Sequence, residues 1–371
     1  MAEDPAVISA LRLFSPAPQA RPRVPPQART REAAKTKLLL LAKYSGLFAL
    51  ARQLTKDKAR ILAYHGIWLG DGKFGNFLYM SAATFSRRMA LLAQWQYPIV
   101  PLSALTNPDG DHPPCATAIT IDDGWHGTWS VMLPVLEQYN YPATVYLTTY
   151  YCLNQNPVID VALQYCFHVV ENRNIGTVHL PQYQFGPFYL KTEAARQDAF
   201  MAALDTAKGL SSDWERQGFL QLLCRELGID HEKLLVKRWF HLMNPDEVRD
   251  AAARGISFEC HTHHHRTTHR GESSLAQEII INSEHIQQLT GKVPQHFCYP
   301  SGHYSQNMWP TLEKNRLISA TTTDIGLVDG SSARYALPRI LDGQDVSELE
   351  FEAEMSGFME LVRRLRTLYN R

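Results

Sequence analysis

The sequence lacks paired cysteines and has no excess of charge of either sign. Its six cysteines are scattered, with no two in a CxxC arrangement, so neither a zinc ribbon nor a disulfide framework is indicated. We interpret them as free thiols, which suits a reducing compartment. Lys plus Arg and Asp plus Glu both number 37. A chain without net charge has no global footprint for nucleic acid, which we therefore exclude as a partner.

Two features of exported and membrane-spanning chains are also missing near the N-terminus. The first residues do not combine a basic start, a long apolar run and a small-residue cleavage site, as a secretory signal does. The apolar stretch over 38–51 is interrupted by Lys43 and is shorter than the roughly 20 residues of a membrane span. We therefore expect a cytoplasmic protein, or one peripheral to the inner face of a membrane.

The N-terminal composition predicts two segments before the main domain. Residues 1–34 are rich in Pro and Arg, which predicts a disordered tail. Residues 35–59 are apolar with basic flanks, which predicts an amphipathic basic helix. We favour packing of this helix onto the domain. The alternative is peripheral contact with an anionic membrane surface through residues 35–58.

From residue 60 onward, short apolar segments alternate with helical stretches, which predicts an α/β fold with a parallel sheet. The strand candidates are "RILAYHGI", "YPIVPL", "ATAITID", "YPATVYLTT", "ISFECH", "QHFCYP", "LISATTT" and "LPRIL". This number is enough for a closed or nearly closed (β/α) barrel over 60–345. A mostly helical insertion is predicted over 150–242, and a C-terminal helix over 346–371.

Residues capable of chemistry follow several of these strand candidates. Asp122 and Asp123 end one strand, "HTHHH" follows a second, and "SGHY" follows a third. The loops after the C-terminal ends of strands share one face of a (β/α) barrel, where active sites are built. We therefore expect these separate stretches to meet in one pocket.

The densest of these stretches has five histidines in the nine positions from His261 to His269. The spacing of His261 and His265 allows both imidazoles to bind one cation, and Asp123 would complete a two-histidine, one-carboxylate set. Ligand type alone does not distinguish zinc from non-haem iron. The adjacent Asp122 could then act as the base for a water at the cation.

"TIDDGW" followed at long range by "HTHHH" resembles the first two motifs of the polysaccharide deacetylases, the NodB-homology carbohydrate esterases. Further stretches are similar in the same order, over roughly 60–341 except much of the insertion. The resemblance implies a deformed (β/α) barrel of about seven or eight strands. It also implies hydrolysis of the N-acetyl group of an amino sugar with one divalent metal ion, for which we expect zinc, with cobalt or nickel as alternatives.

By motif, the resemblance makes Asp122 the catalytic base and Asp123, His261 and His265 the metal ligands. The third family motif implies that backbone N–H groups of the "YPSG" loop help to hold an oxyanion. The residues that we expect to contact substrate or oxyanion are Tyr299, Pro300, Ser301, Gly302 and Trp125.

The sequence departs from the family motifs in two places. Cys298 stands where the family usually has an arginine, and Arg339 could replace that arginine by pairing with Asp122. No histidine follows His303, although the family's closing motif has one that protonates the leaving amine. The candidates for that proton donor are His303, His263, His126 and His65. Asp324 could instead orient a histidine.

We therefore expect an N-deacetylase whose partner is an N-acetylated glycan: a polysaccharide, an oligosaccharide or a lipid-linked glycan. Two alternatives are a non-catalytic glycan-binding relative and an O-acetyl esterase acting on a glycan. The presence of both aspartates and both histidines favours catalysis, because a lectin needs no base beside a metal ligand.

Overall fold

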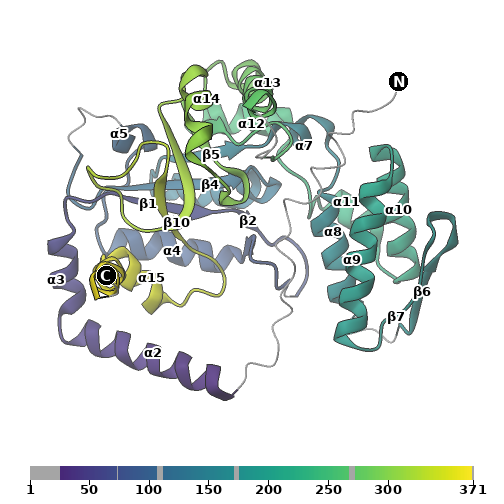
Figure 1. Ribbon diagram of the computed structural model, residues 1–371, viewed down its shortest axis with the longest axis horizontal. Helices are drawn as coiled ribbons and strands as arrows, with labels where there is room; N and C mark the ends of the chain where they lie inside the picture. Colours follow the sequence, from purple (N-terminus) through teal and green to yellow (C-terminus); the bar gives the residue numbers. More distant parts are fainter. Residues whose placement is uncertain (1–25, 73, 107–111, 171–174, 267–271, 370–371) are drawn as a thin grey trace.

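Seven parallel strands form a closed barrel at the centre of the molecule, in the order β1-β11-β10-β9-β8-β5-β4 (Figure 1). The computed structural model describes residues 26–72, 74–106, 112–170, 175–266 and 272–369. The barrel strands are β1 (Arg60–Tyr64), β4 (Thr117–Asp123), β5 (Ala143–Leu147), β8 (Ser257–Cys260), β9 (His296–Cys298), β10 (Ser319–Ile325) and β11 (Leu337–Leu341). The predicted (β/α) barrel is confirmed, with seven strands.

The eighth strand candidate, over 97–102, forms only an isolated bridge between Ile99 and Thr117. The Val100 N–H donates to Thr117 O, and the Thr117 N–H donates to Pro98 O, both at 2.9 Å. Pro98 and Pro101 cannot donate backbone hydrogen bonds, so the ladder cannot extend in either direction. This segment therefore lies beside β4 without becoming a barrel strand.

Helices surround the barrel and connect its strands (Figure 1). They are α4 (Ala82–Gln94), α5 (Leu102–Thr106), α6 (Leu133–Gln138), α12 (Pro245–Ala253), α13 (Glu272–Thr290), α14 (Trp309–Lys314), α15 (Glu348–Met355) and α16 (Phe358–Tyr369). Local sequence sets where several of them begin. At α12, for example, the Asn244 side chain accepts from the Glu247 N–H and the Glu247 side chain accepts from the Asn244 N–H, with Pro245 between them.

The mostly helical insertion lies beside the barrel (Figure 1). It comprises α7 (Thr149–Asn154), α8 (Ile159–Val170), α9 (Glu193–Gly209), α10 (Asp213–Glu226) and α11 (His231–Val236), with a hairpin of β6 (Thr177–Leu180) and β7 (Phe185–Tyr189). Its helices bury an apolar cluster of their own that includes Val161, Phe200 and Phe219. Trp68, which directly follows the short strand β2 (Gly66–Ile67), joins this cluster, because its ring lies 5.5 Å from Tyr165 and 5.4 Å from Trp239.

The terminal helices differ from the single helices expected at each end. The N-terminal segment forms α2 (Pro26–Tyr44) and α3 (Leu47–Leu54), separated at Gly46, whose φ is 82°. Helix α2 thus begins within the expected tail, of which residues 1–25 lie outside the described part of the chain. Gly357, with φ 78°, separates α15 from α16, and a Cβ there would lie 2.2 Å from Thr55 Oγ1. Among the described helices, none is long and apolar enough to cross a membrane.

Candidate active site

Three buried side chains converge at the C-terminal ends of β4 and β8 as the sequence predicts. The Oδ1 atom of Asp123 lies 3.3 Å from the Nε2 atom of His261 and 3.3 Å from that of His265. One ligand atom from each of the three residues lies within 4.8 Å of the other two. The strand end therefore brings together two imidazole nitrogens and one carboxylate oxygen from positions far apart in the sequence.

This spacing fits a small divalent cation. Metal–ligand bonds of about 2.1 Å in tetrahedral geometry put neighbouring ligand atoms about 3.4 Å apart. The 3.3 Å separations in the triad of Asp123, His261 and His265 match that value. They exceed the 2.7–2.9 Å typical of a charge-assisted N–H to O hydrogen bond. The donor set of the triad thus suits a cation better than a direct hydrogen bond between its members.

Other buried groups orient two of these side chains. The Nδ1 atom of His261 lies 2.8 Å from the carbonyl oxygen of Cys298. A carbonyl oxygen can only accept, so Nδ1 carries a proton, and the contact turns Nε2 toward Asp123. The indole N–H of Trp125 donates to Asp123 Oδ2 at 2.8 Å. This contact leaves Oδ1 of Asp123 facing both histidines.

The predicted role of Trp125 as a sugar-stacking residue does not agree with the structure. The Trp125 side chain is only 1% exposed, and its ring packs against Tyr79 at 5.1 Å. A sugar cannot reach a ring face that is covered in this way. The position of Trp125 next to the aspartates correctly indicated that it belongs to the site. Its role is to orient Asp123, and its side chain is not exposed to solvent.

The remaining described histidines of the cluster hold the loop in place. His264 receives two contacts from Glu278 on α13: its N–H donates to Oε2, and its Nδ1 lies 2.8 Å from Oε1. His263 Nδ1 lies 2.8 Å from Thr149 Oγ1. The pKa of His263 is lowered to about 4, and burial is the largest cause of this shift. Two histidines therefore anchor the loop that presents the other two.

Four of the eleven non-glycine residues with positive φ in the described part of the chain lie at this site. Asp123, Thr262, His265 and Ser301 all have positive φ, between 56° and 69°. For a β-branched residue such as Thr262 this conformation is a rare one. Strained residues persist only where the surrounding structure imposes them, and they occur preferentially at functional sites.

Asp122 forms the pair with Arg339 that its position suggested. Arg339 Nη1 donates to Asp122 Oδ1 at 2.8 Å, and Nη2 donates to Oδ2 at 2.7 Å. Its Nε donates to Thr322 O at 2.8 Å. The guanidinium also lies 3.3 Å from Cys298 Sγ. Because the cysteine side chain is small, the Arg339 side chain from β11 can occupy the space beside it.

This pair decides the charge of a fully buried carboxyl group. Burial is the largest effect and by itself raises the pKa of Asp122, but the charge and hydrogen bonds of Arg339 outweigh it, and the pKa lies below its usual value. Two carboxylate oxygens offer about four acceptor positions. The bidentate contact with Arg339 therefore leaves Asp122 ionised and able to accept a further proton donor.

A cavity of about 910 Å³ opens onto Asp122, Asp123 and the two histidines of the triad. Besides these residues, its walls come mainly from residues 74–81 after β2 and residues 341–346 after β11. Neither segment was predicted to line the site, although each lies downstream of the C-terminal end of a barrel strand. Phe77 is the exposed aromatic residue of this lining, at 58%, with its ring 6.3 Å from that of His65.

The loop from Tyr299 to Gly302 borders the cavity through Tyr299, Ser301 and Gly302. The Tyr299 N–H donates to Thr321 O at 3.3 Å. Gly302 N–H already donates to Tyr299 O at 2.9 Å, so this amide is not available to an oxyanion. Tyr299 is buried, and its hydroxyl donates to Tyr335 O at 2.9 Å. Pro300 is buried as well. A Cβ at Gly302 would lie 1.9 Å from Thr323 Oγ1, so the turn requires glycine there.

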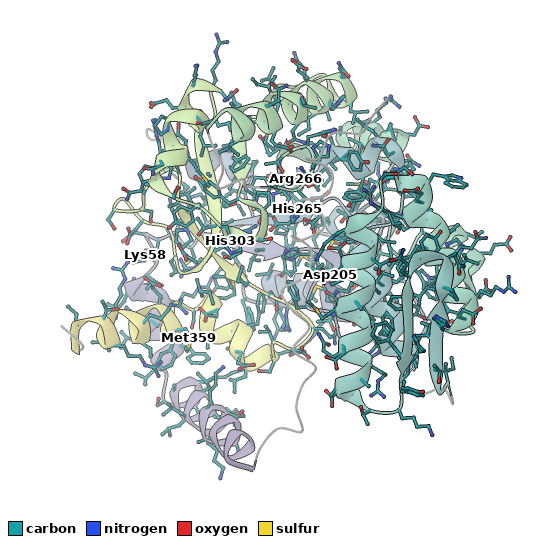
Figure 2. The ribbon with its side chains drawn as sticks, turned by 45° about the vertical axis from the view of Figure 1, so that its right-hand side comes forward. Lys58, Asp205, His265, Arg266, His303 and Met359 are labelled. Carbon is teal, nitrogen blue, oxygen red and sulfur yellow. The ribbon has the colours of Figure 1, made fainter. Side chains whose placement is uncertain are left out.

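Of the four candidate proton donors, His65 and His303 line the cavity. His65 Nε2 lies 3.7 Å from Asp122 Oδ2. Figure 2 shows His303 and His265 over the central part of the molecule, on loops that follow β9 and β8. His126 is engaged elsewhere, with its Nδ1 3.0 Å from Arg238 Nη1. Asp324, the predicted partner of a histidine, accepts a hydrogen bond from Tyr304.

Two solved structures share this fold. The PplD deacetylase of Streptococcus pyogenes, in complex with acetate, is 13% identical, with a TM-score of 0.52, over 80% of this chain and 98% of that one. IcaB of Ammonifex degensii is 14% identical, with a TM-score of 0.51, over 81% of this chain and 97% of that one. A search of curated proteins finds no match.

The family model for polysaccharide deacetylase matches residues 109–180 and 227–317. The first range contains both aspartates at the end of β4, and the second contains the histidine loop and the turn after β9. The match therefore covers the same strand ends that carry the buried triad. With these residues held together in the barrel, the chain is similar to the polysaccharide deacetylase family over these two ranges.

Proposed function

We propose that the protein is a metal-dependent N-deacetylase acting on an N-acetylated amino sugar within a glycan. The observation that carries this proposal is the pair of 3.3 Å separations between Asp123 Oδ1 and the Nε2 atoms of His261 and His265. They bring three ligand atoms together beside a second, ionised carboxylate. A binding protein has no need for that second group.

Asp123, His261 and His265 would hold one divalent cation, and zinc is the first choice for two imidazoles and a carboxylate. When bound, such a cation polarises an acyl carbonyl and lowers the pKa of a water molecule toward ~7. Cobalt and nickel are alternatives, because affinity among these ions follows geometry and availability as much as ligand type.

Asp122 would accept the proton of the attacking water, because it is ionised, faces the cavity and adjoins Asp123 in sequence. Arg339 keeps this carboxylate charged and fixed in orientation through its two hydrogen bonds. Arg339 is therefore a positioning residue in this proposal.

The leaving amine needs a proton donor, and we assign this role to His303. His65 and His303 both line the cavity. His65 lies 3.7 Å from the oxygen of the base, which places it on the side where the proton is taken up. A donor to the amine must be a different group, and His303 is the remaining candidate that lines the cavity.

Acetate release from a panel of soluble N-acetylated and O-acetylated oligosaccharides tests the proposal. The purified protein should be stripped of metal and then assayed with zinc, cobalt or nickel added. We expect acetate from N-acetylated substrates, restored by metal. Release only from O-acetylated substrates would favour an esterase, and tight glycan binding without release would favour a lectin.

His261→Ala provides the matched test of the metal site. We expect this variant to fold and to lose most of its bound metal, because one of three protein ligands is gone. His179→Ala is the control, since His179 is exposed on β6 of the insertion, away from the triad. Full metal content in His261→Ala would contradict the assignment.

A further inference from the structure

Exposed apolar side chains are concentrated on three terminal helices. In the part of the chain that the structure describes, nine of the nineteen exposed large hydrophobic residues lie on α2, α3 and α16. They are Leu38, Leu40, Leu41, Tyr44, Leu47, Leu50, Leu54, Leu365 and Leu368. Single exposed leucines are ordinary on a protein surface. A group of this size on adjoining helices indicates an interaction surface.

These three helices, which we call the terminal platform, are already attached to the domain by other residues. Leu39 and Ala42 of α2 and Phe48 of α3 are buried in one cluster with Ala353 of α15. Figure 2 labels Met359 on α16, which packs against the same cluster. The exposed leucines are therefore not needed for attachment of the helices, and they form a second apolar face.

The helices of the terminal platform also contain more basic than acidic residues. Its three helices carry nine Lys or Arg residues and two Glu, whereas the whole chain has equal numbers of basic and acidic residues. Four of these basic residues have acidic partners. Lys35, Lys43 and Arg363 pair with Glu350, Glu352 and Glu354 of α15. Arg364 pairs with Asp329 and Glu360. Exposed Lys37 and Arg366 add positive charge on the same helices as the leucines.

We propose that the terminal platform docks on an anionic lipid bilayer. Exposed leucines beside basic side chains match the two contributions to interfacial binding, which are burial of apolar surface and attraction to acidic headgroups. A second copy of the chain would instead bring two basic surfaces together, and like charges facing each other oppose association. This proposal uses no residue of the active site and stands apart from the proposed function.

Vesicle sedimentation of the full-length chain tests this proposal. Vesicles of phosphatidylcholine alone are compared with vesicles that also contain about 30% phosphatidylglycerol. We expect the protein to sediment with the anionic vesicles, and binding to weaken at high salt because surface charges are screened. Absence of sedimentation with the anionic vesicles would overturn the proposal.

Three variants separate the two contributions. Leu41→Ser with Leu50→Ser should lower partitioning about tenfold or more, because two exposed leucines no longer enter the bilayer. Lys37→Glu with Arg366→Glu should remove the preference for anionic vesicles. Trp214→Ser is the matched control, since Trp214 is 85% exposed but lies on α10 of the insertion, and its partitioning should equal that of the parent chain.

Thermal melting shows that each variant is folded before its vesicle binding is compared. Equal partitioning of the double leucine variant and the parent chain would overturn the proposal. Light scattering supplies a further decisive result. A parent chain that is dimeric and does not bind vesicles, while the leucine variant is monomeric, would assign this face to a second copy and overturn membrane docking.

Discussion

The barrel and the insertion each bury an aspartate, and the two carboxyl groups have opposite surroundings. At the barrel mouth, Asp122 receives two hydrogen bonds from Arg339, and its pKa lies below its usual value even though burial opposes this. In the insertion, Asp160 on α8 is fully buried, and neither carboxylate oxygen has a hydrogen-bond partner among the described residues. The pKa of Asp160 is raised to about 8, and burial is the largest cause of this shift.

Burial alone therefore does not identify a catalytic carboxylate. Both groups lose contact with water, which favours the neutral acid in each case. The partner decides the outcome. The guanidinium of Arg339 outweighs burial at Asp122, whereas the charge of Lys208 does not outweigh burial at Asp160, whose pKa stays raised. The charged group lines a cavity, and the neutral one lies within a helical core.

Removing the charge at the barrel mouth should have the largest effect. Asp122→Asn keeps the shape and the proposed metal ligands but removes the proposed base, so we expect acetate release to fall by about 10² to 10⁴. Metal content, measured on the same preparation, should not change. Asp123→Asn should lower both quantities. Full turnover in Asp122→Asn would show that the carboxylate of Asp122 is not the base.

Replacing Arg339 by Met should give Asp122 surroundings like those of Asp160. Removal of one partner of a buried ion pair costs about 3–5 kcal/mol, because the remaining charge is uncompensated. We expect a loss of that size in chemical denaturation. Arg334→Met is the control: Arg334 and Glu313 are exposed partners, and the change should cost at most ~1 kcal/mol. Equal effects of the two substitutions would contradict the importance of the buried pair.

Trp125→Phe should weaken metal binding without removing it. The substitution deletes the N–H that holds Asp123 Oδ2 but keeps an apolar ring in the buried site. Loss of such an orienting contact typically lowers metal affinity 10- to 100-fold, which isothermal titration with zinc would measure. Tyr79→Phe is a control, because Tyr79 packs on the same indole without contacting the metal ligands. Unchanged affinity in Trp125→Phe would show that the indole is only a packing residue.

Asp160→Asn should alter the pH dependence of stability, with an expected effect of about 1–3 kcal/mol. The folded pKa of Asp160, about 8, lies above the ordinary value of 3.8. The folded state therefore holds a proton that the unfolded state releases, and stability falls as pH rises from about 4 to 8. Denaturation at pH 5 and pH 8 should show a smaller decrease for Asp160→Asn than for the parent chain. An identical decrease would mean that Asp160 is not buried as a neutral acid.

The sequence was sufficient for the barrel and for the triad because both depend on local order. Asp123 directly follows an apolar strand, and His261 and His265 follow another, so the rule that strand ends share one face brings them together. The pairing of Arg339 with Asp122 could be anticipated from the same rule. Cys298 was a further signal. The small residue stands where the family usually has an arginine, so a guanidinium for Asp122 had to come from another position.

Other features depended on contacts that no spacing reveals. The position of Trp125 after the aspartates suggested substrate contact, but Tyr79, in the short strand β3 (Tyr79–Met80), covers its ring. The amide of Gly302 is taken up within its own turn by Tyr299 O. The strand expected over 97–102 is lost because two prolines interrupt its hydrogen bonding. In each case, a tertiary contact or a missing donor overrides a reasonable local expectation.

The aromatic contacts of Trp68 have a consequence for exchanging parts between related barrels. Trp68 lines the cavity on one side and packs against Tyr165 and Trp239 of the insertion on the other. A graft of the segment after β2, from Trp68 through the cavity wall, into another barrel would leave the Trp68 ring without its packing partners. The transferable module is therefore the wall together with the insertion, and recombination that separates them should yield insoluble chimaeras even when the barrel itself is unchanged.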